Sequence, residues 1–387
     1  MKRIHQALLI ALLAFFLRFY LAYTGPIEYD EPAYTANVIN LNLGLRQGNW
    51  NQILDSTDIF EHPQFFKLVY AAGLLTSKSI QKIVPFQLGE LRSVPYWPQI
   101  FSLRLVSVFF GAAAVFLLSL VHPLAGLFLA IDTLAIKYTS VVYLDALPAF
   151  ACLAAFLAAL KALEKYQKHA GRWAVWLALS ALALGMTAAS KYMYAVPGIA
   201  IAAAVIWQGW KRKLPVLLGL AAWGLLSLAF FFVLDPALWH APLVRLGESI
   251  SFNVYYSRGP HVMEVGYPFW QPIRWLLLPI PQQPTQPEVA FFVNPGNYFI
   301  LADSLIFALA VVGLPAFFRQ NKPMFLWLFT GLAFLLVWGT KWPQYTLLIL
   351  APFCLSAASG FDFIRLHLPA AQLKIRGWLQ KLRRAEK

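Results

Sequence analysis

Charged residues are scarce in this sequence: Asp, Glu, Lys and Arg together make up 12% of the 387 residues, whereas 60% are hydrophobic. Soluble domains carry roughly 25% charged residues, so the composition excludes an ordinary soluble globular protein. Cysteine is rarer still, with only Cys152 and Cys354, both inside hydrophobic runs. The sequence contains no Cys-x-x-Cys motif and no Cys/His cluster, which excludes a disulfide framework and a thiolate zinc site. We interpret both thiols as packing residues.

Long hydrophobic runs make up most of the sequence. A membrane-spanning helix needs about 20 apolar residues. About ten runs approach this length, at residues 7–24, 100–121, 123–141, 146–163, 173–190, 193–209, 214–234, 299–318, 323–340 and 343–362. We therefore predict an all-α, polytopic integral membrane protein with about 10 transmembrane helices. The first run also has the basic start of a cleaved signal peptide, an alternative that its length and the many later runs disfavour.

The formal net charge of +14 is distributed unevenly between the connecting segments. Cytoplasmic loops are enriched in Lys and Arg, so the side of each connector can be predicted from its charge. The basic residues concentrate at one set of connectors and at both ends, at Lys2, Arg3, Lys161, Lys165, Lys168, Arg172, Lys211, Arg212, Lys213, Arg319, Lys322 and the segment 365–387.

This charge pattern predicts that both termini are cytoplasmic and that segments 25–99 and 235–298 are external. We predict a transmembrane catalytic domain at residues 1–364, followed by a basic cytoplasmic tail at 365–387, in the cell (plasma) membrane. The placement of the charges argues for the lipid bilayer, and against nucleic acid, as their partner. The basic tail is suited to anionic lipid headgroups.

Both external segments show features of juxtamembrane structure. Tyr34, Val38, Leu41 and Leu45 recur at helical spacing, opposite Asn37, Asn40 and Asn42, which predicts a helix lying flat on the membrane with Trp50 as an interfacial anchor. The apolar stretch 62–75 is too short for a full span and favours a half-inserted helix. The second external segment is rich in proline, which is typical of either an ordered surface loop or a lid.

Several charged residues lie at the predicted outer ends of spans. A charge near hydrocarbon is costly unless it is paired or faces a polar cavity, so these residues are functional candidates. Snorkelling to the headgroups is the alternative for each single Lys or Arg, but the mixture of signs on one side favours a shared polar cavity. The set comprises Asp30, Glu31, Glu61, His62, Lys67, Arg104, Lys137, Asp145, Lys191 and Lys341.

The order of these residues resembles that of the protein O-mannosyltransferases and their bacterial relatives, the aminoarabinose transferases that modify lipid A, in the GT-C glycosyltransferase superfamily. Asp30-Glu31 looks like the family's acidic pair, and IFEHPQFFKLVYAAG is similar to its aromatic-acid-His-Pro-Pro segment. Four later segments of this sequence also resemble motifs of the family, namely SLRLVSVFFGA, VVYLDALPAF, GMTAASKYMY and KWPQYTLLILAPF. The chain departs from the family where Gln64 replaces the second proline, and it shows no β-trefoil accessory domain.

The resemblance implies transfer of a monosaccharide from a polyprenyl-phosphate-linked donor to an acceptor hydroxyl of a protein, lipid or glycan, at the external face. A carboxylate must accept the hydroxyl proton, and Asp30 is our candidate base for an inverting displacement. The phosphate leaving group needs positive charge rather than an acid. The resemblance places Arg104 on that phosphate, and it implies substrate-binding roles for Glu31, Glu61, His62, Lys67, Asp145 and Lys191.

Other interpretations stay open for single residues. Asp30 and Glu31 could cap a surface helix at Pro32, or they could hold a divalent metal. Apart from that metal, we predict no cofactor. His62 could be structural, and Asp145 could cap the helix that follows it.

Two other functions are compatible with most of these features: a transporter or flippase of lipid-linked sugars, and a surface polysaccharide polymerase or ligase. Transporters favour binding sites at the membrane midplane between two related halves. Here the candidate charges lie at the outer rim and the sequence shows no repeat, so we favour an enzyme.

Overall fold

The computed structural model describes residues 2–28, 30–54, 62–75, 97–168, 172–209, 213–279 and 297–385. In these residues the regular elements are all helices, as predicted. Within these described ranges, six helices contain segments long and apolar enough to cross a membrane: α1 (Lys2–Thr24), α5 (Trp97–Val121), α8 (Ala146–Gln167), α11 (Lys213–Leu234), α16 (Asn297–Gln320) and α18 (Leu347–Ala385). The chain is therefore an all-α, multi-pass membrane protein.

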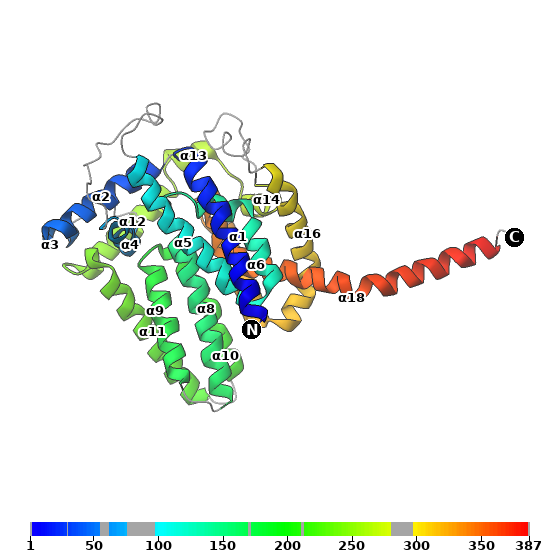
Figure 1. Ribbon diagram of the computed structural model, residues 1–387. Coiled ribbons are helices and arrows are strands. Elements are labelled where there is room, and N and C mark those ends of the chain that lie inside the picture. The colour runs from blue at the N-terminus through cyan, green and yellow to red at the C-terminus, as the bar shows by residue number, and fades with distance from the viewer. Residues whose placement is uncertain are drawn as a thin grey trace.

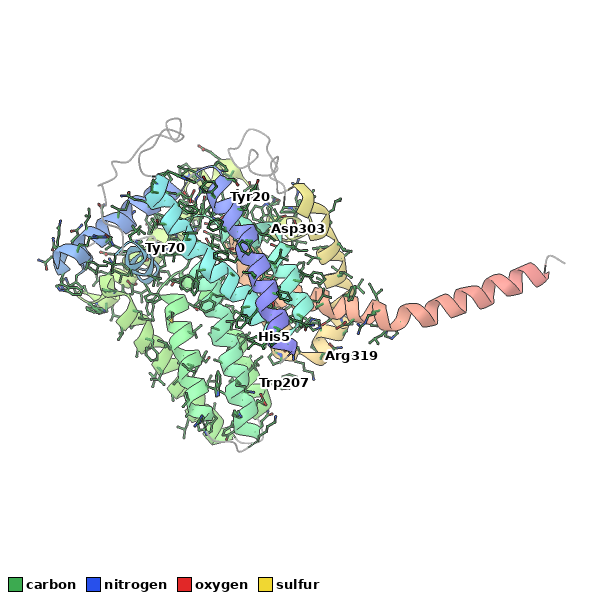
Figure 2. The ribbon with its side chains drawn as sticks, in the orientation of Figure 1. His5, Tyr20, Tyr70, Trp207, Asp303 and Arg319 are labelled. Carbon is green, nitrogen blue, oxygen red and sulfur yellow. The ribbon has the colours of Figure 1, made fainter. Side chains whose placement is uncertain are left out.

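Three shorter apolar helices complete the bundle: α9 (Trp173–Ala188), α10 (Pro197–Gly209) and α17 (Lys322–Val337). All three fall in runs that the hydropathy pattern predicted as spans. Figure 1 shows the N-terminus at one end of the bundle, with the ends of α8 to α11 that lead to basic connectors. Figure 2 places His5, Trp207 and Arg319 toward that same end. Helices α2 (Glu31–Gln47), α13 (Pro260–Val265) and α14 (Gln271–Leu277), which belong to the segments predicted to be external, lie at the opposite end (Figure 1).

The run 123–141 does not form the single span that was predicted. It is divided into α6 (Pro123–Ile131) and α7 (Thr133–Tyr138), because Asp132 is extended and its carboxylate accepts a hydrogen bond from the backbone N–H of Ala135. The last carbonyls of α6 then need donors within the bundle. Arg18 of α1, which is buried, supplies them by donating to the carbonyls of Leu129 and Ala130 at 3.1 Å each.

The described residues of the first segment predicted to be external form α2 (Glu31–Gln47), α3 (Trp50–Leu54) and α4 (Phe65–Gly73), on one flank of the bundle in Figure 1. Tyr34, Val38 and Leu41 are buried on the predicted apolar face of α2. Asn42 was predicted on the polar face but is buried, because α4 packs against α2 there and the Asn42 Nδ2 donates to the carbonyl of Ala71 at 2.7 Å.

The second segment predicted to be external contains three helices between Pro242 and Leu277 rather than a plain loop there. It forms α12 (Pro242–Tyr256), α13 (Pro260–Val265) and α14 (Gln271–Leu277), each with a proline at its first or second position. Proline suits the first helical turn because its missing N–H has no partner there in any case. The proline-rich stretch therefore starts helices, and residues 280–296 of this segment lie outside the described ranges.

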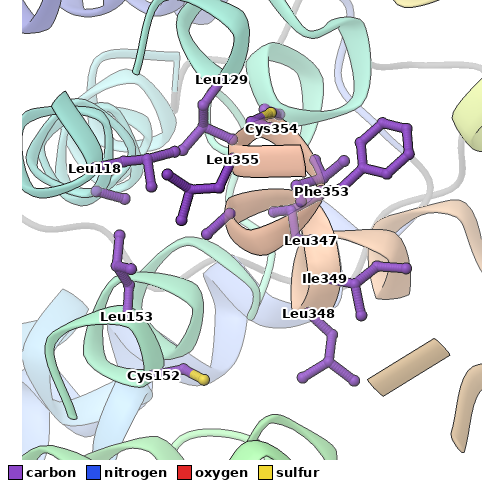
Figure 3. Packing of buried hydrophobic residues seen from close by; sticks show 14 of the residues in the cluster. Leu118, Leu129, Cys152, Leu153, Leu347, Leu348, Ile349, Phe353, Cys354 and Leu355 are labelled. Carbon is purple, nitrogen blue, oxygen red and sulfur yellow. The ribbon is translucent and has the colours of Figure 1, made fainter. Parts of the chain in front are cut away.

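The hydrophobic core is centred on α18. Figure 3 shows Leu118 of α5 and Leu129 of α6 converging on Leu355 of α18, with Leu153 of α8 nearby. Cys152 and Cys354 are free thiols buried in the same cluster, as predicted from their place in apolar runs. Burial of these side chains fixes α18 against the helices whose outer ends carry the candidate site.

Gly313 and Gly360 mark a close approach of α16 and α18. A Cβ on Gly313 would lie 1.9 Å from the carbonyl oxygen of Ser356. Small residues allow such crossings in membrane bundles. We expect Gly313→Leu to push the two helices apart and to destabilise the protein by about 1–3 kcal/mol, measured as a lower melting temperature in detergent. Gly219→Leu in α11, where a Cβ meets nothing within 4 Å, is the matched control. Equal melting temperatures for the two variants would contradict this packing.

Candidate active site at the outer helix ends

A buried connector, residues 139–145, links α7 to α8 and forms the floor of the candidate site. Buried backbone N–H and C=O groups need hydrogen-bond partners. The N–H of Val142 donates to Glu31 Oε1 at 2.7 Å, and the carbonyl of Val141 accepts from Ser107 Oγ at 2.7 Å. The connector is therefore held by α2 and α5, and it carries Tyr143 and Asp145.

Glu31 and Arg104 form a fully buried ion pair, with both side chains 0% exposed. Arg104 Nε donates to Glu31 Oε1 at 2.8 Å, and Nη2 donates to Oε2. The remaining N–H groups of Arg104 donate to the carbonyls of Ala22, Gly25 and Pro26. A guanidinium has five N–H donors. All five are used here by the protein itself.

This ion pair fixes the segment that precedes α2 to the start of α5. Glu31 also accepts from the N–H of Glu28 at 2.9 Å, and Glu28 in turn lies 3.4 Å from Lys137 of α7. The sequence predicted that Glu31 and Arg104 contact substrate. In the structure they contact each other, and the predicted phosphate contact of Arg104 would require its present partners to be displaced.

Asp30 lies between these anchored residues, at the N-cap position of α2. Its side chain is half-buried and makes no capping hydrogen bond, so the structure does not support the alternative of a helix cap. Pro32 starts the first turn of α2 behind it. Asp30 is therefore a half-buried carboxylate on a segment that Glu31 and Arg104 hold in place.

Tyr34 lies one helical turn after Asp30 in α2, and its ring lies near two other parts of the site. Its centroid lies 6.1 Å from Tyr143 of the connector and 6.3 Å from His62, which precedes α4. Lys67, in the first turn of α4, lies with its Nζ 3.5 Å from the carbonyl of His62. The structure thus brings the predicted residues His62 and Lys67 beside the helix that Asp30 begins.

Asp145 and Lys191, both predicted site residues, form a second buried pair. Asp145 Oδ1 accepts from Lys191 Nζ and from the Tyr194 hydroxyl, at 2.8 Å each. Lys191 Nζ also lies 4.8 Å from the ring centre of Tyr345 in η5 (Pro343–Thr346). Asp145 makes no capping hydrogen bond to α8, so its role is this pairing rather than the cap that was the alternative.

The remaining candidates are placed differently. Lys341 donates to the carbonyls of Leu336 and Trp338, at the C-terminal end of α17, where a cation is favourable. Glu61 lies outside the described residues. The described residues contain no group of three or more His, Cys, Asp or Glu side chains that could hold a metal ion. Because both oxygens of Glu31 already accept N–H groups, the Asp30–Glu31 pair fits a divalent metal poorly.

Sequence reasoning missed three residues of this region: Tyr194, Tyr345 and Asp235. Tyr345 lies in the KWPQYTLLILAPF motif, so the motif itself was the available signal. Asp235 directly follows α11 and is 1% exposed. An acid at the end of an apolar helix and before a proline was the signal there, but none of the segments quoted above includes it.

No family model matches the sequence, and no curated protein matches it. One similar solved structure is ArnT from Cupriavidus metallidurans bound to undecaprenyl phosphate, with a TM-score of 0.57 and 15% identity, covering 92% of this chain and 59% of that one. The apo structure of the same ArnT matches with a TM-score of 0.55 and 15% identity, over 96% and 62% of the two chains. This chain therefore spans less than two thirds of the length of ArnT. It has the GT-C-type membrane fold of these structures, as its sequence motifs predicted.

Proposed function

We propose that the protein is a membrane glycosyltransferase that moves one sugar from a polyprenyl-phosphate-linked donor to an acceptor hydroxyl of a protein, lipid or glycan. The observation that carries the proposal is the fold shared, over 92% of this chain, with a structure bound to undecaprenyl phosphate. The cluster of acids and lysines at the outer helix ends supports it, because a phosphate leaving group and a hydroxyl nucleophile need these two kinds of side chain.

Asp30 is the proposed base. It accepts the proton of the acceptor hydroxyl as the acceptor oxygen bonds to the anomeric carbon and the bond from that carbon to the phosphate oxygen breaks. Attack from the face opposite the phosphate inverts the anomeric centre. Glu28 and Glu31 are buried against Lys137 and Arg104, whereas the Asp30 side chain is half-buried at the start of α2, where an acceptor can approach its carboxylate.

Lys67 and Lys191 are the proposed phosphate partners, since Lys67 brings positive charge beside His62 from α4 and Lys191 brings it beside Tyr345 from the end of α9. Asp145 orients Lys191 through the 2.8 Å contact. His62 and Glu61 keep their proposed contacts with the donor. Arg104 acts indirectly in this scheme, because it fixes Glu31 and the carbonyls that precede Asp30.

A transporter of lipid-linked sugars is the second candidate, and the broken helix α6–α7 is the observation that favours it. Transporters place binding sites at such breaks. Here Arg18 donates hydrogen bonds to the carbonyls at the end of α6, and Asp132 caps α7. The protein's own side chains therefore satisfy the backbone groups at the break. The enzyme remains the better explanation of the residues around Asp30.

One assay separates the two. Purified protein is incubated with labelled polyprenyl-phosphate sugars and candidate acceptors, and both free polyprenyl phosphate and labelled product are measured. The enzyme releases polyprenyl phosphate together with glycosylated product. Movement of intact lipid-linked sugar across vesicles, without release, would overturn the proposal in favour of a transporter.

The proposed topology gives a further prediction. Asn49→Cys, at the exposed start of α3, is expected to react with a membrane-impermeant thiol reagent on intact cells, because segment 25–99 is external in our proposal. Lys168→Cys, at the exposed end of α8, is expected to react only after lysis. The native Cys152 and Cys354 are buried and contribute little background. The reverse pattern of labelling would invert the orientation of the whole protein.

A further inference from the structure

Lys137 is a buried lysine of α7 to which none of the quoted motifs assigns a role, although its charge made it a functional candidate. Its side chain is 0% exposed, and its Nζ lies 3.4 Å from Glu28 Oε2. Glu28 is buried as well, with a side chain that is 8% exposed. A buried charge is costly unless a charge of the opposite sign lies beside it. Each of these two side chains therefore supplies the counter-charge of the other.

Glu28 belongs to a short turn that encloses Asp30. The N–H of Glu31 donates to the carbonyl of Glu28 at 3.2 Å, and the N–H of Glu28 donates to Glu31 Oε2 at 2.9 Å. The carbonyl of Asp30 then accepts from the N–H of Tyr34 at 3.1 Å, at the start of α2. Asp30 is thus held between a closed turn and a helix, so a displacement of Glu28 would displace Asp30 as well.

The turn is joined to the buried connector at two places. At one end, Glu31 accepts from the N–H of Val142 in the connector. At the other end, Glu28 is paired with Lys137, whose own carbonyl accepts from the N–H of Ser140 at 3.0 Å. Lys137 therefore links the turn to the first residues of the connector, and its loss would leave the turn attached to the floor of the site at the Glu31 end.

The aromatic neighbours of Lys137 belong to the same site. Its Nζ lies 5.2 Å from the ring centre of Tyr138. The Tyr138 ring packs edge-on against Tyr143, with centroids 5.6 Å apart, and the Tyr143 ring packs in turn against Tyr34. Lys137 therefore contacts both the turn that carries Asp30 and the aromatic rings of the site.

Stability alone does not account for an ion pair at this position. Hydrophobic residues of similar volume often stabilise a fold as well as a buried ion pair or better, because the two charges must first be stripped of water. The ion pair instead gives each side chain one defined partner, so that the turn has one preferred position on α7. The position of the turn is therefore the property that the Lys137–Glu28 pair explains.

We propose that Lys137 is a positioning residue for the base: it holds Glu28, and through the turn it sets where the Asp30 carboxylate meets the acceptor hydroxyl. The inference rests on the proposed function. A general base must lie within hydrogen-bond reach of the proton that it accepts, and a displacement of about 1 Å can lower a rate about 100-fold. Loss of the pair should therefore lower kcat about 10- to 100-fold. Donor affinity should change little, because Lys67 and Lys191 have other contacts.

The test removes both charges at once. Lys137→Met alone would leave Glu28 buried without a counter-charge, and the resulting loss of stability would obscure any effect on the reaction. Lys137→Met combined with Glu28→Gln leaves no unpaired charge, so this double variant should melt close to the wild type. The matched control is Lys161→Met combined with Glu164→Gln, which makes the same two substitutions at an ion pair near the C-terminal end of α8.

Wild type and the two double variants are compared by kcat and donor KM, measured as release of polyprenyl phosphate, with undecaprenyl phosphate binding and thermal melts alongside. We expect the Lys137→Met, Glu28→Gln variant to have a kcat about 10- to 100-fold below that of wild type. Its donor KM and its binding of undecaprenyl phosphate should stay close to wild type. The control variant should match wild type in all four measurements.

The same pair of substitutions in an Asp30→Asn background supplies the second readout. Once the base is absent, its position no longer affects the rate, so removal of the Lys137–Glu28 pair should have no further effect on kcat. Damage to the site in general would instead lower kcat by the same factor in both backgrounds. The comparison therefore separates positioning of the base from a merely structural role.

Three results would overturn the inference: a wild-type kcat in the Lys137→Met, Glu28→Gln variant, an equal loss of kcat in the Asp30→Asn background, or a raised donor KM with kcat unchanged. A large drop in the melting temperature of this double variant would overturn it as well, because the pair would then serve stability. If wild type neither turns over donor nor binds undecaprenyl phosphate, the proposed function itself fails, and this inference fails with it.

Discussion

Replacing Asp30 by Asn is expected to lower turnover by about 10²- to 10⁴-fold, the contribution typical of general base catalysis. Asn has nearly the same size and still forms hydrogen bonds, but it cannot accept the proton of an acceptor hydroxyl. Because Asn keeps the size and the polar character of this half-buried side chain, the substitution should leave the fold intact. Turnover is measured as release of polyprenyl phosphate, and donor binding is measured separately and should survive.

The control for Asp30→Asn is Asp362→Asn, which removes an acid outside the site. The informative comparison is Glu31→Gln. Glu31 accepts four hydrogen bonds, from Arg104 twice and from the N–H groups of Glu28 and Val142, so Glu31→Gln should lose stability as well as activity. If Asp30→Asn kept most of its activity while a stably folded Glu31→Gln lost it, the base would be Glu31.

Arg104→Ala is expected to be among the most destabilising single substitutions in the protein. It would leave the Glu31 carboxylate buried without a counter-charge, a change that costs about 3–5 kcal/mol when one partner of a buried pair is removed. It would also leave the carbonyls of Ala22, Gly25 and Pro26 without their donor. The measurement is a thermal melt in detergent, with protease susceptibility of the segment before α2 as a local readout.

Two further variants sharpen this prediction. Arg104→Lys keeps one charge but offers three donors in place of five, so its effect should lie between wild type and Arg104→Ala. Arg104→Met combined with Glu31→Gln removes both charges, and it should be less destabilised than the sum of the single changes. An unchanged melting temperature for Arg104→Ala, together with a raised donor KM, would restore the phosphate contact that the sequence motif suggested for Arg104.

Much of the fold could be predicted because apolar length and charge asymmetry are local signals. The apolar runs anticipated the main helices, and the spacing of Tyr34, Val38 and Leu41 anticipated the buried face of α2. The division of α6 from α7 could not be predicted in this way. The average hydropathy of residues 123–141 is high although the run contains one Asp, so it gives no sign of a break. The break leaves carbonyls at the end of α6 without helical partners, and Arg18, more than 100 positions away in the sequence, donates to them.

For the candidate site, too, the sequence predicted which residues matter better than it predicted their contacts. Motifs located Asp30, His62, Lys67, Asp145 and Lys191, but they could not show which side chains pair. Glu31 and Arg104 are 73 residues apart, and Asp145 and Lys191 are 46 apart. Helix packing determines such partners, and the packing cannot be read from the sequence. For this reason Arg104 was predicted to contact a phosphate rather than Glu31.

The contact between Arg18 and the end of α6 has a consequence for how the chain enters the membrane during synthesis. An arginine within a membrane helix opposes insertion, by about 2.5–3.5 kcal/mol at the helix centre on the translocon scale and by less toward a helix end, where Arg18 lies. The open carbonyls of α6 are also unsuited to lipid. Arg18 and the end of α6 therefore each make insertion less favourable alone, and each satisfies the other once both are present. We therefore expect α1 to be retained beside the translocon until α6 emerges, so that the two enter the bilayer as one unit.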